Sequence, residues 1–332
     1  MLKIAVVGLG AVGKIHATNL LDNDAAKLSA VCDPRSDATL PFTEASDASA
    51  TECMDQLLDT QPDAVIISSS TATHEEIVGK CVAANVPFLC EKPLAQNIES
   101  AEQLVAAVEE KKLITATALN RRFDPQYSAI QSAVSKGEIG ACEIVCFTSR
   151  STSPPTVEFS RTSGGLFAEK GSHFFDLARW ITGEEPEEIS AMGSVLIEPG
   201  FADIGECDTA VIAMKMKGGV LCRFDFSWRT AYGQDERIEV HGSNGLLTTY
   251  QLPVGRVIQP DGRSDNSEHQ LQTWQERFAE TYRRELDAFT SLLTTGQPHP
   301  VLASIKDGLI AQKIGAAAKI SASEGRPAKI DS

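Results

Sequence analysis

"LKIAVVGLGAVGKIHATNLL", residues 2–21, decides the fold of the first part of this chain. Residues 2–7 form an apolar run, interrupted only by Lys3, with the length of a buried strand. Gly8, Gly10 and Gly13 follow at once, and the residues after them have the apolar spacing of a helix. A strand, a GxGxxG turn and a helix in this order are typical of dinucleotide-binding units. The stretch therefore predicts a Rossmann domain, which is a doubly wound parallel sheet with an α/β fold.

Each glycine of this turn has its own physical reason. Gly8 permits the tight turn, Gly10 lets the main chain approach a pyrophosphate, and Gly13 lets the helix pack closely on the strand. The pyrophosphate would then meet free N–H groups at the helix N-terminus. We expect Gly8, Gly10, Ala11, Val12 and Gly13 to bind a cofactor. The alternative is a glycine-rich turn that holds no ligand.

A second apolar run, residues 28–32, ends in Asp33, twenty residues after Gly13. An acid at this place can accept hydrogen bonds from the adenosine ribose. Its charge would repel a 2′-phosphate, so we predict NAD as the cofactor. Arg35 follows two residues later and can pair with a phosphate, which keeps NADP possible.

Between Asp33 and residue 51 we expect a loop with a short helix. After this loop, strand and helix patterns alternate up to residue 121. Ligands bind at the carboxyl ends of the strands in such a sheet. The remaining expected cofactor contacts lie after these strands: Ser69, Thr71, His74, Glu91 and Asn120.

The stretch "FLCEKPLAQN", residues 88–97, ends an apolar run with a glutamate, a lysine and a proline. Pro93 cannot continue a strand, and the bond before it can be cis. Lys92 is thus expected at the carboxyl edge of the sheet, beside the cofactor. A surface loop of the same composition is the alternative.

Bulk composition limits the classes of function. A length of 332 residues predicts two domains, and a formal net charge of −15 opposes a general affinity for nucleic acid or anionic membranes. The eight cysteines form no CxxC pair, so we expect buried free thiols. We see neither a signal peptide nor a membrane span, and we expect a cytoplasmic protein.

From Pro125 onward, the pattern changes. A helix is followed by strand-like runs without helices between them, which predicts a C-terminal α+β domain with an open, mostly antiparallel sheet. The expected runs are 143–148, 189–197, 209–215, 220–228, 237–241 and 246–250, with helices at 274–293 and 305–322. We place a NAD-binding domain at residues 1–121 and a substrate-binding and oligomerisation domain at residues 122–332.

Several motifs now stand in a recognisable order: GLGAVGKIH (8–16), EKPLA (91–95), NRRFDP (120–125) and GGLFAEKGSHFFDLARW (164–180). With them, the chain resembles the glucose–fructose oxidoreductase, inositol dehydrogenase and rhizopine-catabolism family of NAD(P)-dependent oxidoreductases over essentially its whole length. The stretch AYGQDERIEVHGSNG (231–245) looks most like the inositol 2-dehydrogenase branch. The resemblance implies a homodimer or homotetramer that associates through the open sheet.

The resemblance also implies roles for particular residues. Lys92 would be catalytic, and Glu169 and His173 would form the acid–histidine pair, although Glu169 stands where the family usually has aspartate. Arg121 and Tyr232 match polyol-contacting residues of the inositol dehydrogenases. Their alternatives are a surface or phosphate-facing arginine and a core aromatic. The histidine and asparagine that this branch carries on the first strand of its second domain are not recognisable in residues 148–152.

Together these residues predict hydride transfer from a secondary alcohol of a cyclic polyol or sugar to the nicotinamide. His173 and Lys92 would take the hydroxyl proton and stabilise the alkoxide, and the sequence leaves open which of them is the base. A metal site at Glu169, His173 and Asp176 is not expected, because the HExxH spacing is absent. The alternatives are reduction of a keto-sugar or another ketone, and a non-catalytic dinucleotide-binding sensor. The presence of both Lys92 and His173 counts against the sensor.

Overall fold

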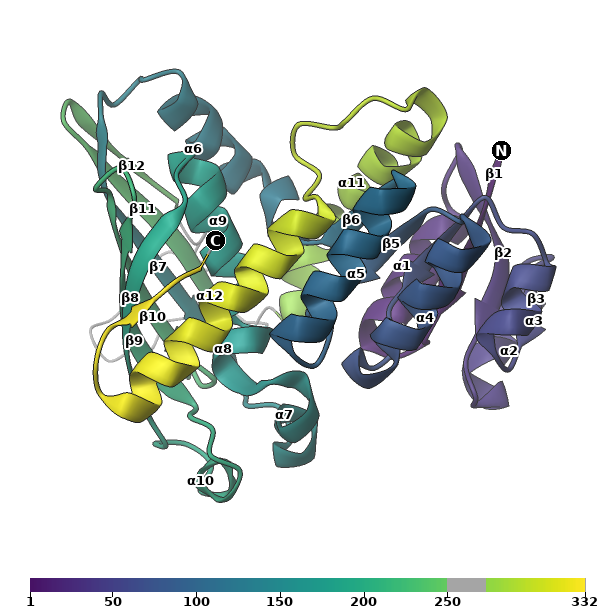
Figure 1. Cartoon of the computed structure of the whole chain (residues 1–332), viewed down its shortest axis with the longest axis horizontal. Helices are drawn as coiled ribbons and strands as arrows, with labels where there is room; N and C mark the ends of the chain where they lie inside the picture. Colours follow the sequence, from purple (N-terminus) through teal and green to yellow (C-terminus); the bar gives the residue numbers. More distant parts are fainter. Residues whose placement is uncertain (250–272, 332) are drawn as a thin grey trace, which may run out of the picture. The chain divides into compact units, whose positions relative to one another are not determined.

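A computed structural model describes residues 1–249 and 273–331 (Figure 1). The chain forms two compact units. Unit 1 comprises Met1–Phe123 and Ala279–Gln312, and unit 2 comprises Asp124–Phe278 and Lys313–Ser332. The expected boundary after residue 121 therefore lies two residues from the observed one. Residues 279–312, which we expected in the second domain, belong to unit 1.

Unit 1 is built on a parallel sheet with the strand order β3-β2-β1-β4-β5-β6, which confirms the predicted doubly wound fold. The last strand is followed by the 3-10 helix η1 (Asn120–Phe123). Its other elements in chain order are β1 (Leu2–Val7), α1 (Ala11–Leu21), β2 (Ala26–Cys32), α2 (Ser36–Ala45), β3 (Ser49–Thr51), α3 (Met54–Asp59), β4 (Ala64–Ile67), α4 (Thr71–Ala84), β5 (Phe88–Glu91), α5 (Ile98–Lys111) and β6 (Thr115–Ala118).

The segment between β2 and α3 is more ordered than we expected. A loop with a short helix was predicted, whereas the structure has the ten-residue helix α2 and then strand β3. β3 pairs with β2 from Ala30 and Ser49 onward and lies at the edge of the sheet. An edge strand needs little apolar surface, and its polar sequence SAT therefore gives no strand signal.

Alternate residues of the parallel sheet enter two separate cores. One core contains Val65 and Ile67 together with α3, α4 and α5. The other contains Ala64 and Ile66 together with α1 and α2. Helix α11 (Trp274–Thr295) adds Leu286 and Phe289 to this second core, while Ile305 of α12 (Ile305–Glu324) joins the first. Burial of these side chains explains why residues 279–312 belong to unit 1.

Unit 2 contains a seven-stranded sheet with the order β12-β11-β7-β10-β9-β8-β13. All neighbours are antiparallel except β10 and β7, which run parallel. The prediction of an open, mostly antiparallel sheet is confirmed, with one parallel pair added. The elements are α6 (Pro125–Ser135), β7 (Cys142–Arg150), α7 (Val157–Ser163), α8 (Gly165–Glu169), α9 (Gly171–Thr182), β8 (Pro186–Ser194), α10 (Gly200–Asp203), β9 (Thr209–Met216), β10 (Leu221–Ser227), β11 (Asp235–Gly242), β12 (Gly245–Thr248) and β13 (Ala328–Lys329).

The end of one expected strand, at Tyr250, lies outside the described residues.

The start of α6 shows how the local sequence determines where a helix begins. Asp124 accepts hydrogen bonds from the main-chain N–H groups of Gln126 and Tyr127, and Pro125 fills the first helical position. These are the preferred residues for a helix N-terminus, because the cap satisfies donors that the helix leaves open.

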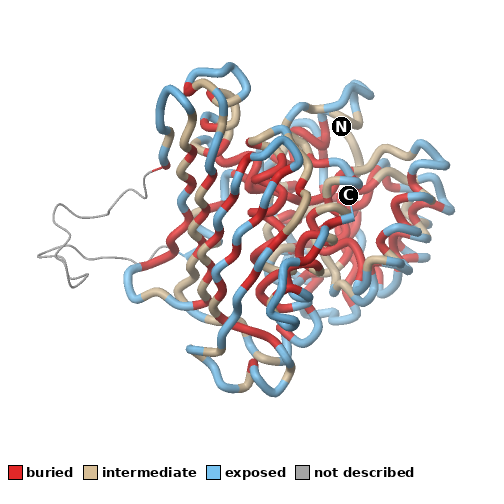
Figure 2. Tube along the Cα trace, turned by 60° about the vertical axis from the view of Figure 1, so that its left-hand side comes forward, coloured by how far each residue is buried: buried red, intermediate tan, exposed pale blue. Residues whose placement is uncertain are grey.

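Buried residues alternate with less buried ones along strands of the seven-stranded sheet (Figure 2), so its two faces differ. On the inner face, Phe147, Phe224 and Phe226 pack against Phe174 and Phe175 of α9, with ring centroids 5.1–6.1 Å apart between helix and sheet. The outer face presents large apolar side chains that are exposed: Ile144, Met192, Val211, Leu221 and Leu246. Alternation along each strand places one set inside and the other outside.

All eight cysteines are free, as expected. Cys32, Cys81 and Cys90 are buried in one core of the parallel sheet, and Cys222 is buried on β10 of the seven-stranded sheet. Cys207 is also buried, whereas Cys53 is exposed and Cys142 and Cys146 are half-buried. Across residues 1–249 and 273–331, we find no helix with the length and apolar character needed to span a membrane.

Candidate active site

The glycine turn after β1 has the form that a dinucleotide requires. Gly8 has φ +83°, and a Cβ on it would lie 2.3 Å from the Cα of Ser69. A Cβ on Gly13 would lie 1.8 Å from the carbonyl oxygen of Gly8. Gly10 differs, because a Cβ there meets no atom within 4 Å. The packing of the protein itself therefore explains the first and third glycines, whereas Gly10 leaves open space in which a pyrophosphate fits.

Two helices begin at this edge of the sheet without a side chain capping them. The N-cap of α1 is Gly10, and Ala11 and Val12 form its first turn. The N-cap of α4 is Ser70, whose side chain makes no capping hydrogen bond, and Thr71 is its first residue. Next to it, the Ser69 hydroxyl accepts a hydrogen bond of 2.7 Å from Thr73. Uncapped first-turn N–H groups suit an anionic ligand.

Asp33 follows β2 and holds the glycine turn directly. One carboxylate oxygen accepts a hydrogen bond of 2.8 Å from the N–H of Leu9, and the other accepts 3.0 Å bonds from the main chain and the guanidinium of Arg35. Burial raises the pKa of Asp33, but the hydrogen bonds from Arg35 and Leu9 outweigh it, so the pKa is lowered overall. The carboxylate is therefore charged at neutral pH, as recognition of a ribose diol requires.

His74 is buried and connects two main-chain segments of this edge. Its Nδ1 lies 3.0 Å from the carbonyl oxygen of Pro93, and its Nε2 lies 3.1 Å from that of Ser69. Burial lowers its pKa, although the hydrogen bonds to main-chain carbonyls act the other way. The structure thus shows His74 supporting the turns after β4 and β5. Direct contact between His74 and a cofactor stays a prediction.

Lys92 lies at the carboxyl end of β5, where the sequence placed it. The Lys92–Pro93 peptide bond is cis. Glu91, the last residue of β5, points at the fully buried His16, with 2.9 Å between the carboxylate oxygen and Nε2. The rings of His16 and Tyr282 form a T-shaped pair with a centroid distance of 5.5 Å. The segment before Lys92 is therefore fixed by buried polar and aromatic contacts.

The end of β6 carries a second buried polar group. The Asn120 side chain donates to the hydroxyl of Thr281 at 2.9 Å and accepts from Arg121 at 3.1 Å. Arg121 is 7% exposed, so it is not the surface arginine that we considered as an alternative. Among the described residues, neither carboxyl oxygen of the fully buried Glu285 has a hydrogen-bond partner.

We did not single out Glu285 in the sequence, because its helix contains several acidic residues and the pattern does not distinguish this one from the others. Burial raises its pKa well above the usual range, the nearby Glu91 raises it further, and Arg121 acts in the opposite direction. Burial therefore favours the protonated form of this carboxyl group in the folded protein. The only signal in the sequence was its spacing of three residues from Tyr282, on the buried side of α11.

Unit 2 carries the other predicted catalytic residues on two consecutive helices. Glu169 ends the short helix α8, Lys170 connects the helices, and His173 and Asp176 lie in the first two turns of α9. His173 and Asp176 are both buried and, three residues apart, lie on one side of the helix. Gly164, with φ +85°, reverses the chain ahead of α8. The expected grouping of these residues around the start of α9 is present.

Lys170 is a residue whose importance we did not predict. Its ammonium group is buried and donates to the hydroxyls of Ser149 at 3.2 Å and Ser151 at 2.7 Å. It also lies 4.5 Å from the ring centroid of Trp228. The sequence signal was indirect: serines occupy the end of the first strand of unit 2, where the resemblance led us to seek histidine and asparagine.

Tyr232 lies in the turn between β10 and β11 and is about half exposed, so it is not a core aromatic. Its hydroxyl accepts from Arg150 at 3.0 Å and donates to Asp235 at 2.9 Å. Arg150 in turn pairs with Asp225. These partners belong to the outer set of the strand alternation, whereas α9 packs on the inner face. Substrate contact by Tyr232 stays a prediction, and this placement argues against it.

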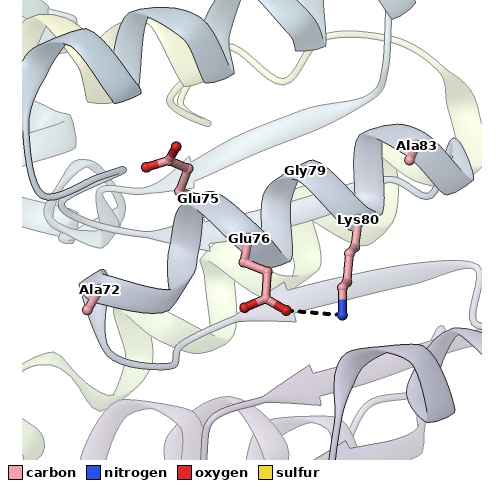
Figure 3. A pocket seen from close by; sticks show the side chains of 6 residues that line it. All are labelled: Ala72, Glu75, Glu76, Gly79, Lys80 and Ala83. Carbon is pink, nitrogen blue, oxygen red and sulfur yellow. Dashed lines mark ion pairs between the residues drawn. The ribbon is translucent and has the colours of Figure 1, made fainter.

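A hollow of about 520 Å³ lies along α4 and is a weaker candidate site (Figure 3). It is lined by Ala72, Glu75, Glu76, Gly79, Lys80 and Ala83. The ammonium group of Lys80 lies 3.0 Å from a carboxylate oxygen of Glu76 and also forms an ion pair with Asp55 (Figure 3 shows the first of these). Acidic side chains of the protein therefore already balance the charge of Lys80. The hollow runs along one helix and does not include the carboxyl ends of the strands. We therefore assign no chemistry to it.

Comparison with known proteins covers both units. The profile described as "Oxidoreductase family, NAD-binding Rossmann fold" matches residues 2–119, and "Oxidoreductase family, C-terminal alpha/beta domain" matches residues 131–330. The chain is 37% identical to myo-inositol 2-dehydrogenase of Thermotoga maritima and 32% identical to inositol 2-dehydrogenase of Rhizobium meliloti, covering 99% of both chains each time. The structure of scyllo-inositol dehydrogenase from Lactobacillus casei with bound NAD(H) and scyllo-inositol is similar at a TM-score of 0.89, with 26% identity and full coverage of both chains.

Proposed function

The chain belongs to the glucose–fructose oxidoreductase, inositol dehydrogenase and rhizopine-catabolism family, and we propose that it is an NAD-dependent dehydrogenase that oxidises a secondary alcohol of an inositol or a related cyclic polyol or sugar. The observation that carries this proposal is the edge of the parallel sheet. There, open space at Gly10, a charged Asp33 and the lysine after β5 occur in one unit. The full-length similarity to inositol 2-dehydrogenases gives the substrate class.

The residues at this edge fit the dinucleotide. The turn from Gly8 to Gly13 and the first N–H groups of α1 would hold the pyrophosphate, and Asp33 would accept from the ribose hydroxyls. The N-terminus of α4 with Ser69 and Thr71, together with Glu91 and Asn120, would surround the remaining part. NAD, when bound, supplies the nicotinamide that accepts the hydride. Asp33 favours NAD, while Arg35 leaves some capacity for NADP.

Lys92 and His173 would divide the work on the alcohol. A neutral carbinol does not release hydride easily, so negative charge must develop on its oxygen as the hydride leaves. In our proposal, His173 takes the hydroxyl proton, the carboxylate of Glu169 orients it, and Lys92 stabilises the oxygen. Either nitrogen group can be the formal base, because an imidazole and an amine can both accept a proton from a hydroxyl group.

Substrate selection would use Arg121 and Lys170. A planar guanidinium can donate to two neighbouring hydroxyls. The Lys170 ammonium, held by two serines, would add a further donor on the side of unit 2. Because the histidine and asparagine of the inositol branch are not recognisable at residues 148–152, the isomer of the substrate is not assigned.

Two further proposals concern the oligomeric state of the protein and its location in the cell. We propose a homodimer or homotetramer in which the exposed apolar face of the seven-stranded sheet meets a second copy. We propose a cytoplasmic location, because eight free cysteines suit a reducing compartment.

One screen tests the function. Purified protein is incubated with NAD or NADP and a panel of inositol isomers and common monosaccharides, and cofactor reduction is followed by absorbance. Reduction of NAD by at least one inositol or sugar is expected. A second panel, with NADH and keto-sugars, tests the alternative of ketone reduction. NADH binding without turnover in either panel would instead support a non-catalytic sensor.

A further inference from the structure

A cysteine, a glutamate and a histidine meet on the seven-stranded sheet of unit 2, away from the proposed catalytic residues. The Sγ of Cys146, a carboxylate oxygen of Glu239 and a ring nitrogen of His241 all lie within 4.8 Å of one another. We propose that these three side chains bind a divalent transition-metal ion of the zinc class. The proposal does not depend on the proposed dehydrogenase activity.

Sheet geometry brings the three groups together. β7 and β11 are antiparallel neighbours, and Cys146 is the direct partner of Glu239 in their register. His241 is two residues beyond Glu239, so its side chain leaves the same face of the sheet. β11 lies between β12 and β7, so neither of the strands that carry the ligands is at an edge. The main chain therefore holds all three side chains on a platform that is fixed before an ion arrives.

The triad lies on the outer face of the sheet, which is opposite α9 and which we propose above to meet a second copy, so the exposures that follow are those of a single chain. Glu239 and His241 each have side chains that are 45% exposed, and Cys146 is half-buried. Val145 and Phe147, the strand neighbours of Cys146, point into the core instead. Because α9 packs on that inner side, the ion would not touch His173. We therefore assign it a role in stabilising the sheet rather than in the proposed hydride transfer.

The donor set selects the ion. Zinc binds thiolate sulfur at about 2.3 Å, imidazole nitrogen at about 2.0–2.1 Å and carboxylate oxygen at about 2.0–2.2 Å, and three protein ligands leave a fourth position for water. Magnesium and calcium prefer oxygen ligands alone, so a thiolate and an imidazole count against them. A thiolate and a carboxylate together carry two negative charges, which balance a divalent cation.

One neighbouring cation counts against the ion: Arg223 on β10 is the register partner of Cys146 and is exposed on the same face of the sheet. In the structure, Nε2 of His241 lies 2.6 Å from the carboxylate of Glu239, which is a hydrogen bond that metal binding would replace. The nearest arginine on β11, Arg237, forms a salt bridge of 2.7 Å with Asp235. Sequence reasoning did not find this site, because Cys146 and Glu239 are far apart in the chain and only the strand pairing joins them.

Cobalt is the probe for the test, because Co²⁺ bound to a thiolate in tetrahedral geometry absorbs strongly. Full-length protein is treated with a chelator, separated from it and titrated with Co²⁺. We expect one ion per chain, with thiolate-to-cobalt charge-transfer and visible d–d bands that Zn²⁺ then removes. Cys146→Ser should abolish the charge-transfer band, whereas Cys142→Ser, a half-buried cysteine on the same strand, should retain it.

His241→Ala provides a second test, which remains informative even if Cys146→Ser does not fold. Loss of a direct ligand should weaken Zn²⁺ binding, measured by calorimetry, by at least the roughly 10–100-fold seen when an outer-shell partner is lost. No charge-transfer band in the wild type, a band that survives Cys146→Ser, or unchanged Zn²⁺ affinity in His241→Ala would each overturn the proposal. Equal loss of the band in Cys142→Ser would overturn the assignment to this triad.

Discussion

The carboxyl edge of the parallel sheet and the α8–α9 segment carry the two halves of the proposed chemistry, and they are built in different ways. At the sheet edge, glycine conformations, helix starts and main-chain hydrogen bonds define the site, as at Gly8, Gly13 and Asp33. In α8–α9, buried ionisable side chains define it, with Lys170 held by serine hydroxyls. A site defined by the main chain can accept a common cofactor in many relatives, whereas a site defined by side chains can change its substrate with a few substitutions.

The largest expected effect tests whether the sheet edge takes part in catalysis as well as in binding. Lys92→Ala should lower turnover by about 10²–10⁴-fold, because one oriented acid–base group contributes about that much. NADH affinity, measured by fluorescence titration, should stay within a few-fold of the wild type. Lys80→Ala, which removes a lysine from the surface of α4, is the matched control and should keep full turnover. Near-normal turnover in Lys92→Ala would remove this lysine from the mechanism.

The next prediction separates glycines required by the fold from the glycine required by the cofactor. Gly13→Ala forces a Cβ to within 1.8 Å of the Gly8 carbonyl, and overpacking of this kind typically costs about 1–3 kcal/mol of folding free energy. Gly10→Ala meets no protein atom, so its melting temperature should match the wild type while its NADH affinity falls. Thermal unfolding with and without NADH distinguishes them. Equal destabilisation by both variants would contradict the assignment of the open space at Gly10 to the cofactor.

These differences explain how much the sequence could predict. Gly8, Gly13 and Asp33 were identified because their roles depend on local main-chain geometry, which a short motif records. The same holds for the end of β5 at Lys92, which a proline marks. Strand β3 was not predicted, because an edge strand of small polar residues lacks an apolar period.

The side-chain clusters were beyond prediction for another reason. Lys170 lies between α8 and α9 and donates a hydrogen bond to Ser149 on β7. Glu285 approaches Glu91 because α11 packs on the parallel sheet. Neither contact has a fixed spacing along the chain, so no pattern in the sequence records it. The division of unit 1 into two segments escaped prediction in the same way, because Leu286 and Phe289 look like any amphipathic helix.

Glu285 sharpens the contrast, because it is a buried acid of unit 1 whose carboxyl oxygens have no hydrogen-bond partner among the described residues. Its raised pKa means that the folded protein keeps a proton that the unfolded chain loses above about pH 4.3. Stability is therefore complete at acid pH and falls as pH rises from there toward the folded-state pKa. Glu285→Gln should remove this loss, which amounts to about 1.4 kcal/mol for each unit of pKa shift.

Urea unfolding at several pH values measures the effect. The stability gained by Glu285→Gln should be near zero at about pH 4 and grow toward neutral pH. Glu280→Gln on the same helix is the control, because that glutamate is exposed and pairs with Arg283 and Arg284, and its variant should show no such growth. A pH-independent difference for Glu285→Gln would show that the acid is ionised in the folded state.

A smaller effect is expected from the α8–α9 segment, where binding rather than chemistry is at issue. Lys170→Met keeps the length of the side chain and its contact with Trp228 but removes the charge. If the ammonium contributes one hydrogen bond to substrate, KM should rise about tenfold, which corresponds to about 1.4 kcal/mol, with NADH affinity unchanged. An unchanged KM for every substrate found in the screen would restrict Lys170 to supporting the fold.

The smallest effect is expected at Tyr232, where the sequence and the structure point in different directions. The resemblance suggests a polyol contact, yet the hydroxyl is already engaged by Arg150 and Asp235 on the outer side of the sheet. Tyr232→Phe should therefore leave KM and turnover nearly unchanged and lower stability by about 0.5–1.5 kcal/mol for each of the two hydrogen bonds that it removes. Steady-state kinetics beside urea unfolding separate the two effects. A large rise in KM without loss of stability would mean that this turn reaches the substrate, so that the substrate half of the site extends beyond the α8–α9 segment.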